Sequence, residues 1–112
     1  MLNNPQLKNS LHVIGISYKK TSAQIRGRFN LSFEASNKLI KDAKKQGISS
    51  IIINSTCNRV EIYAETNDPN ELIKILCFNS HGNKSDFKKF GYVFNNQKAI
   101  DHIFKVGTGL DS

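Results

Sequence analysis

Residues 50–65, which read SIIINSTCNRVEIYAE, decide the fold of this chain because they predict two strands joined by a polar turn. The isoleucines at 51–53 form a short, β-branched apolar run, which we interpret as a buried strand. In the second half, Val60, Ile62 and Ala64 alternate with polar residues, as in a strand with one buried face. The segment between the two runs is short and polar, and it contains Cys57. The sequence therefore predicts a β-hairpin in the middle of the chain.

Upstream of the hairpin, the sequence predicts a strand and then a helix. Residues 11–17 are mainly apolar and predict a strand, and a polar, basic connection follows to about Asn30. Ser32 can cap a helix, because its hydroxyl can accept a hydrogen bond from the first helical turn. The apolar face of this helix consists of Ala35, Leu39, Ile40 and Ala43. Gly47 is suited to end it.

Downstream of the hairpin, the sequence predicts a second helix and a fourth strand. Asp68 can cap a second helix and Pro69 suits its first position, with the helix running to about Asn79. Residues 85–89 are polar and predict a link, and residues 90–94 predict a fourth strand.

A last helix is predicted after Asn96, which can cap it. In this helix Ile100, Ile103 and Phe104 share one apolar stripe, while His102 lies off its centre. From the residues alone, we interpret His102 as a helix-surface histidine.

The order β-α-β-β-α-β with an additional C-terminal helix predicts an α+β fold of the ferredoxin-like, split-βαβ type. At 112 residues the chain is expected to form one domain, spanning residues 11–112, after a frayed tail at residues 1–10. No apolar run approaches the ~18 residues that a membrane span needs. The sequence also lacks the spacing of a metal site, since its three histidines and two cysteines fall in no ligand pattern.

The net charge of +7 favours an anionic partner, although part of this charge can simply be a solvated surface. The clearest cluster is formed by Lys19, Lys20, Arg26 and Arg28. These four side chains lie within one ten-residue stretch of a predicted loop and could bind phosphates. The second cysteine, Cys77, is predicted to lie on the apolar side of a helix, and a disulfide between Cys77 and Cys57 stays an open alternative.

The polar turn around Cys57 suggests reactive chemistry. A thiolate is a strong nucleophile, and a nearby cation such as Arg59 favours the charged form. Arg59 could instead bind a substrate carboxylate through two parallel hydrogen bonds. Thr56 and Asn58 add short polar groups that can orient a small substrate. An incidental thiol in a hairpin turn remains the alternative reading of Cys57.

Three stretches resemble the glutamyl-tRNA reductase family. Residues 55–63, STCNRVEIY, match its signature Ser-Thr-Cys-Asn-Arg-x-Glu-Ile-Tyr, in which only the position of Val60 is free. Residues 15–29 look like its Gly-x-Asn-His-Lys-Thr-Ala-Pro and Val-Arg-Glu-Arg-Leu region, with Tyr18 near the usual histidine and Ala23 near the usual proline. Residues 102–112, HIFKVGTGLDS, resemble the opening of its Gly-Leu-Asp-Ser-x-Val-Leu-Gly-Glu motif. The resemblance runs from about Leu11 to the last residue.

This resemblance implies an NADPH-dependent reduction of glutamyl-tRNA(Glu) to glutamate-1-semialdehyde, the first step of the tRNA-dependent route to 5-aminolevulinate and tetrapyrroles. By the family's roles, Cys57 is the nucleophile that forms a thioester, and His102 is important for activity. Thr56, Asn58 and Arg59 would line the glutamate pocket, with Arg59 on a carboxylate. Ser112 matches a position that contacts substrate.

The resemblance also carries expectations about context. It implies a cytoplasmic enzyme that uses no metal, is not bound to a membrane and hands its product to glutamate-1-semialdehyde aminomutase. The family's NADPH and dimerisation domains would follow residue 112, so this chain is expected to be a monomeric N-terminal catalytic domain that does not bind NADPH by itself. Two other functions stay open: a non-enzymatic RNA-binding or regulatory domain using the patch at 19–28, and a cofactor-free thiol acyltransferase or hydrolase using Cys57.

Overall fold

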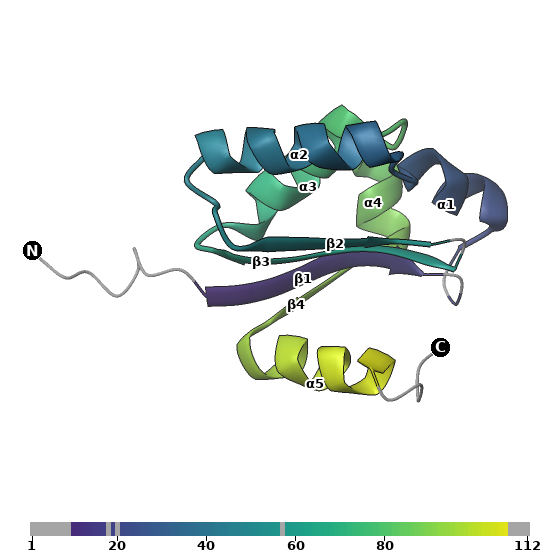
Figure 1. Cartoon of the computed structure of the whole chain (residues 1–112). Helices are drawn as coiled ribbons and strands as arrows, with labels where there is room; N and C mark the ends of the chain where they lie inside the picture. Colours follow the sequence, from purple (N-terminus) through teal and green to yellow (C-terminus); the bar gives the residue numbers. More distant parts are fainter. Residues whose placement is uncertain (1–9, 18, 20, 57, 108–112) are drawn as a thin grey trace, which may run out of the picture.

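The computed structural model describes residues 10–17, 19, 21–56 and 58–107, which build a four-stranded antiparallel sheet with helices on both faces (Figure 1). In chain order the elements are β1 (Ser10–Ser17), α1 (Ala23–Phe29), α2 (Phe33–Lys45), β2 (Ile51–Ser55), β3 (Arg59–Thr66), α3 (Pro69–Asn79), α4 (Lys84–Phe90), β4 (Tyr92–Asn95) and α5 (Asn96–Gly107). The expected tail at residues 1–10 is wrong at its end, because Ser10 already pairs with Thr66 in the sheet. Residues 1–9 lie outside the described residues.

The strand order is β2-β3-β1-β4, and every neighbouring pair is antiparallel. This arrangement confirms the predicted ferredoxin-like fold, in which β1 and β3 occupy the centre. The hairpin between β2 and β3 is also confirmed. The interpretation of residues 51–53 as a buried strand is wrong, since β2 lies at the edge of the sheet and the side chain of Ile52 is 67% exposed.

Local signals placed α2 and α3 correctly. The Ser32 hydroxyl accepts a hydrogen bond from the backbone N–H of Ala35 at 3.0 Å and begins α2. After α2 the chain leaves the helix through Gly47, which has a φ of +85° and so adopts the left-handed conformation that glycine tolerates best. The Asp68 side chain caps α3 in the same way, and α3 ends at Asn79 as predicted.

Two short helices replace segments that were predicted as connections. The basic segment before Asn30 contains α1, whose cap is the Ser22 hydroxyl. The predicted link at 85–89 is instead part of α4, which Asn83 caps by accepting a hydrogen bond from the Asp86 N–H at 2.8 Å. The fourth strand therefore begins at Tyr92. Both helices are only two turns long, so their apolar periodicity is too brief to distinguish them from loops.

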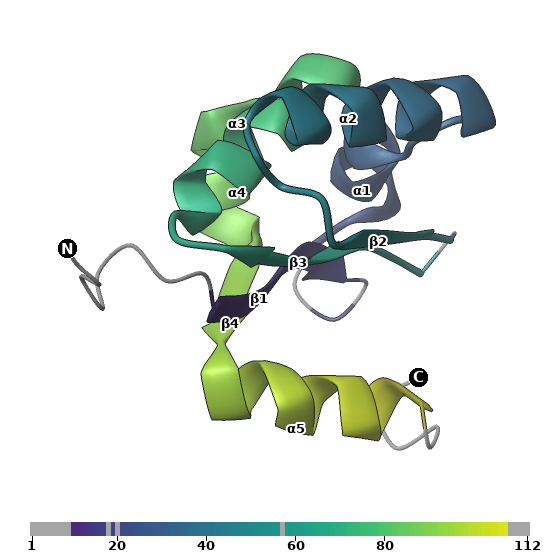
Figure 2. The same ribbon diagram turned by 60° about the vertical axis from the view of Figure 1, so that its left-hand side comes forward.

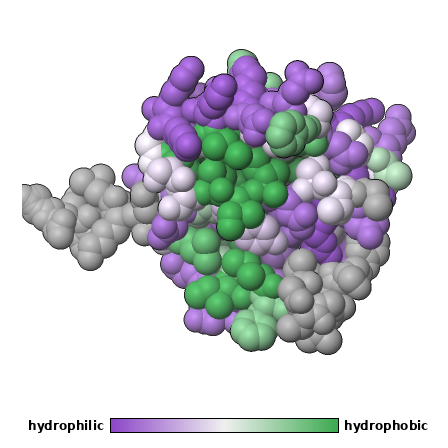
Figure 3. Space-filling view, viewed as in Figure 1, coloured by the Kyte–Doolittle hydropathy of each residue, from purple (hydrophilic) through white to green (hydrophobic). Residues whose placement is uncertain are grey.

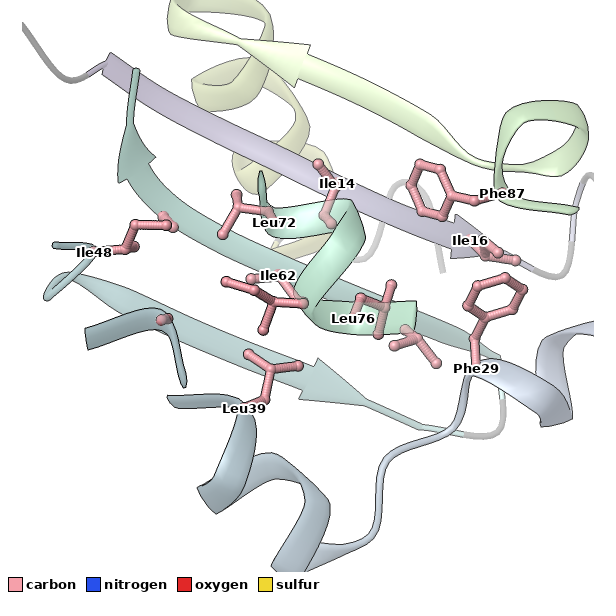
Figure 4. Packing of buried hydrophobic residues seen from close by; sticks show 13 residues of the cluster. Ile14, Ile16, Phe29, Leu39, Ile48, Ile62, Leu72, Leu76 and Phe87 are labelled. Carbon is pink, nitrogen blue, oxygen red and sulfur yellow. The ribbon is translucent and has the colours of Figure 1, made fainter. Parts of the chain in front are cut away.

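The helices α1 to α4 cover one face of the sheet and enclose the main hydrophobic core (Figure 1). Figure 4 shows Leu72 and Leu76 of α3 next to Ile14 and Ile62 of the two central strands. Phe29 of α1 and Phe87 of α4 close one end of this core, with their rings edge to face. Burial of these side chains supplies the main driving force for folding. Cys77 of α3 is a partly buried member of the same packing, in keeping with its predicted place on the apolar side of a helix.

The last helix, α5, lies alone on the opposite face of the sheet (Figures 1 and 2). It packs against β1 and β4, through Ala99 against Val13 and Tyr92. Over the β2–β3 half of this face, the described residues leave a hollow of about 650 Å³ that Ile103 of α5 also lines. Figure 3 shows apolar surface near the β2 edge and again over α5 below it. Within the described part of the chain, no helix is both long and apolar enough to cross a membrane.

Candidate active site

The face of the sheet under α5 carries polar side chains, because apolar and polar residues alternate along β3. Val60, Ile62 and Ala64 enter the main core, which leaves Arg59, Glu61 and Tyr63 on the opposite side. That side is covered where β1 and β4 meet α5, and Glu61 is fully buried there. A buried carboxylate must find hydrogen-bond donors, so its surroundings are strongly constrained.

Four side chains from three elements direct donor groups at Glu61. Tyr63 donates its hydroxyl to Oε1 at 2.5 Å. Tyr92 of β4 and His102 of α5 both donate to Oε2. The Arg59 Nη1 atom lies 3.4 Å from the same oxygen. We call Arg59, Glu61, Tyr63, Tyr92 and His102 the carboxylate cluster.

The titration behaviour of the carboxylate cluster follows from these contacts. Burial by itself would raise the pKa of Glu61, but the hydrogen bonds from Tyr63, Tyr92 and His102 outweigh it and hold that pKa below its usual value. Burial, together with the hydrogen bond to the Glu61 anion, raises the pKa of Tyr63 and of Tyr92 well above the ordinary value. The cluster therefore contains one anion and two neutral phenols at neutral pH.

A glycine makes room for this arrangement. Gly15 of the central strand β1 is paired with Glu61 on one side and with Tyr92 on the other. A Cβ atom at this position would lie 2.8 Å from Glu61 Cγ and 2.9 Å from the Tyr92 hydroxyl. No real side chain fits at such distances, so glycine is required for the two groups to meet across β1.

The surface position inferred for His102 from helix periodicity is wrong. His102 is 8% exposed and points into the sheet, whereas Phe104 of the apolar stripe is 70% exposed. The physical reason is the carboxylate: leaving Glu61 without donors would cost more than exposing apolar side chains to water. Because the ring donates through Nε2, Nδ1 is the acceptor whenever the imidazole is neutral.

A pocket of about 310 Å³ opens beside the carboxylate cluster. Its wall contains Arg59, Tyr92 and His102, together with Ser17 at the end of β1 and Phe94 of β4. The rings of Tyr92 and Phe94 stack with their centroids 5.2 Å apart. The pocket thus combines an aromatic wall with a guanidinium and an imidazole that are held by a common carboxylate.

The hairpin between β2 and β3 borders this region and is stiffened by Thr56. The Thr56 N–H donates to the Arg59 carbonyl at 2.8 Å, which closes the turn. The Thr56 hydroxyl accepts from the N–H groups of Asn58 and Arg59, both at 3.2 Å. These bonds place Arg59 at the first position of β3, from which its side chain reaches the pocket.

The structure therefore unites Arg59 and His102, which are 43 positions apart in the sequence, in one pocket. Thr56 and Asn58 lie in the adjoining hairpin, where Asn58 is exposed. The predicted residues Cys57 and Ser112, like Tyr18, lie outside the described residues. The substrate roles of Thr56, Asn58 and Arg59 stay predictions.

Sequence reasoning missed Glu61, Tyr63 and Tyr92 as site residues. One signal was available: an acidic residue stands between Val60 and Ile62 in a strand, with the apolar residues already assigned to the other face. Tyr92 carried no such signal, because its link to Glu61 depends on β1 lying between β3 and β4.

In the basic patch expected at residues 19–28, both arginines make contacts within the chain. The Arg28 Nη1 atom is 3.4 Å from Asp86 of α4, and Arg26 is partly buried and donates to the Thr21 carbonyl at 2.7 Å. Lys20 lies outside the described residues. Among the described residues, no group of three or more His, Cys, Asp or Glu side chains could hold a metal ion.

The sequence of this chain is similar to a known family of proteins. A family model described as glutamyl-tRNAGlu reductase, N-terminal domain, matches residues 14–112. A glutamyl-tRNA reductase from Flavobacterium psychrophilum is 52% identical over 104 residues, which cover 93% of this chain and 25% of that protein. Glutamyl-tRNA reductase 2 from Flavobacterium johnsoniae is 46% identical over 97% of this chain and 25% of its own length. The chain thus spans about a quarter of the length of the curated relatives it matches.

A solved structure shares the fold. The glutamyl-tRNA reductase from Methanopyrus kandleri aligns with a TM-score of 0.68 at 24% sequence identity, over 91% of this chain and 23% of that one.

Proposed function

The chain belongs to the glutamyl-tRNA reductase family as its N-terminal domain, and on this basis we propose that it forms the acyl-enzyme intermediate of that reaction. In the proposed step, the Cys57 thiolate attacks the ester carbonyl of glutamyl-tRNA(Glu). A carbon–sulfur bond forms, the bond to the tRNA 3′ oxygen breaks, and that oxygen takes a proton to leave as a hydroxyl. The product is a glutamyl thioester on Cys57 and free tRNA.

The observation that carries this proposal is the convergence of Arg59 and His102 on one pocket beside the signature hairpin. Arg59 is positioned to receive a substrate carboxylate, and Glu61 fixes its guanidinium on the inner side. His102 can take the thiol proton on Nδ1 and then pass it to the departing 3′ oxygen, since Nε2 is engaged by Glu61. Thr56 closes the hairpin that leads into Arg59 at the first position of β3.

Reduction of the thioester to glutamate-1-semialdehyde requires a hydride donor, for which the family resemblance implies NADPH. This chain does not fit a dinucleotide: it contains no Gly-x-Gly-x-x-Gly sequence, and its sheet is antiparallel. We therefore propose that the cofactor is bound by a separate domain of a longer, dimeric reductase, and that this domain alone is a monomer. The proposed reaction is cytoplasmic, where aminoacylated tRNA is available, with glutamate-1-semialdehyde aminomutase as the recipient of the product.

A domain exchange tests the proposal. This chain would replace the matching N-terminal quarter of the Flavobacterium psychrophilum reductase, to which it is 52% identical. We expect the chimera to make glutamate-1-semialdehyde from glutamyl-tRNA and NADPH, and to show a glutamyl adduct on Cys57 by mass spectrometry when NADPH is withheld.

The matched variant is Cys57→Ser in the same chimera. A serine hydroxyl is a far weaker nucleophile than a thiolate at neutral pH, so activity and adduct should both disappear while the circular dichroism spectrum stays unchanged. Turnover above a few per cent of the parent chimera would refute the nucleophile assignment.

A further inference from the structure

The imidazole of His102 is held by three groups that belong to the sheet. Its Nε2 atom donates to Oε2 of Glu61 in β3. Its ring lies against two aromatic rings of β4, with centroid distances of 5.4 Å to Tyr92 and 4.9 Å to Phe94. The orientation of His102 is therefore set by the sheet as well as by the helix that carries it.

Tyr92 acts on this imidazole in two ways. Its ring contacts His102 directly, and its hydroxyl donates to Oε2 of Glu61, the same oxygen that accepts from His102. The hydroxyl can reach that oxygen because Tyr92 is paired with Gly15 of β1, where a Cβ atom would lie 2.9 Å from the hydroxyl. Tyr92 thus holds both the imidazole and the carboxylate oxygen to which the imidazole is bonded.

The two oxygens of Glu61 are held by different donors. The terminal torsion of a glutamate side chain is broad, so hydrogen bonds decide where its oxygens lie. Tyr63 donates to Oε1 at 2.5 Å, whereas Oε2 accepts from Tyr92 and from His102. Removal of the Tyr63 hydroxyl leaves both donors at Oε2. Removal of the Tyr92 hydroxyl takes away the donor from β4 that fixes the oxygen bonded to His102.

The charge of Glu61 decides which nitrogen of His102 carries a proton. Burial opposes this charge, but the hydrogen bonds that the carboxylate accepts hold the pKa of Glu61 below its usual value. An ionised carboxylate can only accept hydrogen bonds, so the imidazole presents its Nε2–H to it. A neutral His102 then has its acceptor at Nδ1, the atom that the proposed acyl transfer uses.

We propose that Tyr92 is a positioning residue for the proton transfer of the acylation step: its hydroxyl fixes the Glu61 oxygen that orients His102, and its ring supports the imidazole. This inference rests on the proposed function, in which His102 takes the thiol proton on Nδ1. Tyr92 itself gives up no proton and forms no bond to the substrate. The donor at Oε2 is therefore expected to control the rate of acylation, and the donor at Oε1 only the stability of the carboxylate cluster.

The matched variants Tyr92→Phe and Tyr63→Phe test this difference, because each removes one hydroxyl from the same carboxylate and keeps the ring. Thioester formation on Cys57 would be followed in single turnovers of the chimera with NADPH withheld, over a range of glutamyl-tRNA concentrations. A misplacement of about 1 Å can cost about 100-fold in rate. We expect Tyr92→Phe to lower the maximal rate at least about tenfold and to change the half-saturating concentration less than about threefold. Tyr63→Phe should lower the maximal rate about threefold or less.

A spectroscopic measurement on the 112-residue chain needs no activity. Nitrogen-15 NMR distinguishes protonated from unprotonated imidazole nitrogens, and His102→Gln identifies the resonances of His102 by their loss. The spectra would be recorded at about pH 8, where histidines with the ordinary pKa of about 6.5 are neutral. We expect the proton on Nε2 in the parent chain and in Tyr63→Phe, and both tautomers in Tyr92→Phe.

The possible outcomes separate this inference from the proposed function. Equal losses of rate in the two variants would overturn the inference, and so would an unchanged tautomer in Tyr92→Phe, since the hydroxyl at Oε2 would then act on stability alone. An inactive parent chimera, together with the expected change of tautomer in Tyr92→Phe, would contradict the proposed function and support the orientation of His102 by Tyr92.

Discussion

Replacement of Glu61 by glutamine is the sharpest test of the carboxylate cluster. Glutamine keeps the size of the side chain but removes its charge and places an NH₂ group where one of the two oxygens stood. An amide nitrogen at the Oε2 position would face the donors of Tyr92, His102 and Arg59. At the Oε1 position it would reverse the hydrogen bond with Tyr63, whose hydroxyl would then have to accept. Arg59, which is 5% exposed, would also lose the carboxylate that lies 3.4 Å from its Nη1 atom.

The expected cost follows from these losses. A hydrogen bond to a charged group contributes about 1.5–3 kcal/mol, and removal of one partner of a buried ion pair typically costs about 3–5 kcal/mol. The two effects overlap, so we expect Glu61→Gln to lower the free energy of unfolding by about 3–5 kcal/mol. A domain of this size has roughly 5–15 kcal/mol in total. The variant should therefore unfold at least about 10 °C below the parent chain.

The measurement is urea and thermal denaturation followed by far-ultraviolet circular dichroism. The control is Glu65→Gln, an exposed glutamate on the same strand, which should change stability by less than about 0.5 kcal/mol. If Glu61→Gln costs no more than this control, the cluster does not stabilise the fold and the reasoning is refuted.

The pH dependence supplies a second readout. The folded-state pKa of Glu61 lies below its usual value, so its ionisation stabilises the folded chain above the unfolded pKa of about 4.3. That contribution is lost as the pH falls from there through the folded pKa. The difference in stability between parent and Glu61→Gln should therefore be constant at neutral pH and shrink below about pH 4.

Three further changes are predicted from other parts of the structure. Gly15→Ala should cost about 1–3 kcal/mol in urea denaturation, because its Cβ would collide with Glu61 and Tyr92; an unchanged midpoint would show that β1 can shift to admit it. Arg59→Lys in the chimera should lower kcat/KM for glutamyl-tRNA by about ten- to a hundredfold, since a point charge loses the bidentate geometry, and a value within twofold would exclude Arg59 as the carboxylate receptor. Ser32→Ala should cost about 1 kcal/mol by removing the cap of α2, whereas Ser32→Asp should keep most of the stability.

The local elements could be predicted from the sequence because their signals are short-range. Ser32 and Asp68 cap helices through groups three or fewer residues away, and both predictions are confirmed. The hairpin at 51–66 is another such case, since a polar turn between two β-prone runs needs no distant partner. The order of these elements was sufficient for the fold class.

Burial could not be read from the same local patterns. Residues 51–53 were predicted to be a buried strand, yet the pairing of β1 with both β3 and β4 leaves β2 at the edge. In α5 the periodicity favoured Ile100, Ile103 and Phe104 as the packed face, but the helix turns His102 to the sheet instead. Which face of a strand or helix is buried depends on which strands become neighbours in the sheet.

The residues of the signature and their identity as a family motif are thus properties of the sequence alone. The carboxylate cluster is a property of the tertiary structure. Glu61, Tyr92 and His102 are brought together only when β1 separates β3 from β4 and Gly15 leaves space between them. A buried carboxylate has to be satisfied by donors, and in this fold the donors come from distant parts of the chain. That requirement, which is not local, sets the orientation of α5 and with it the shape of the pocket.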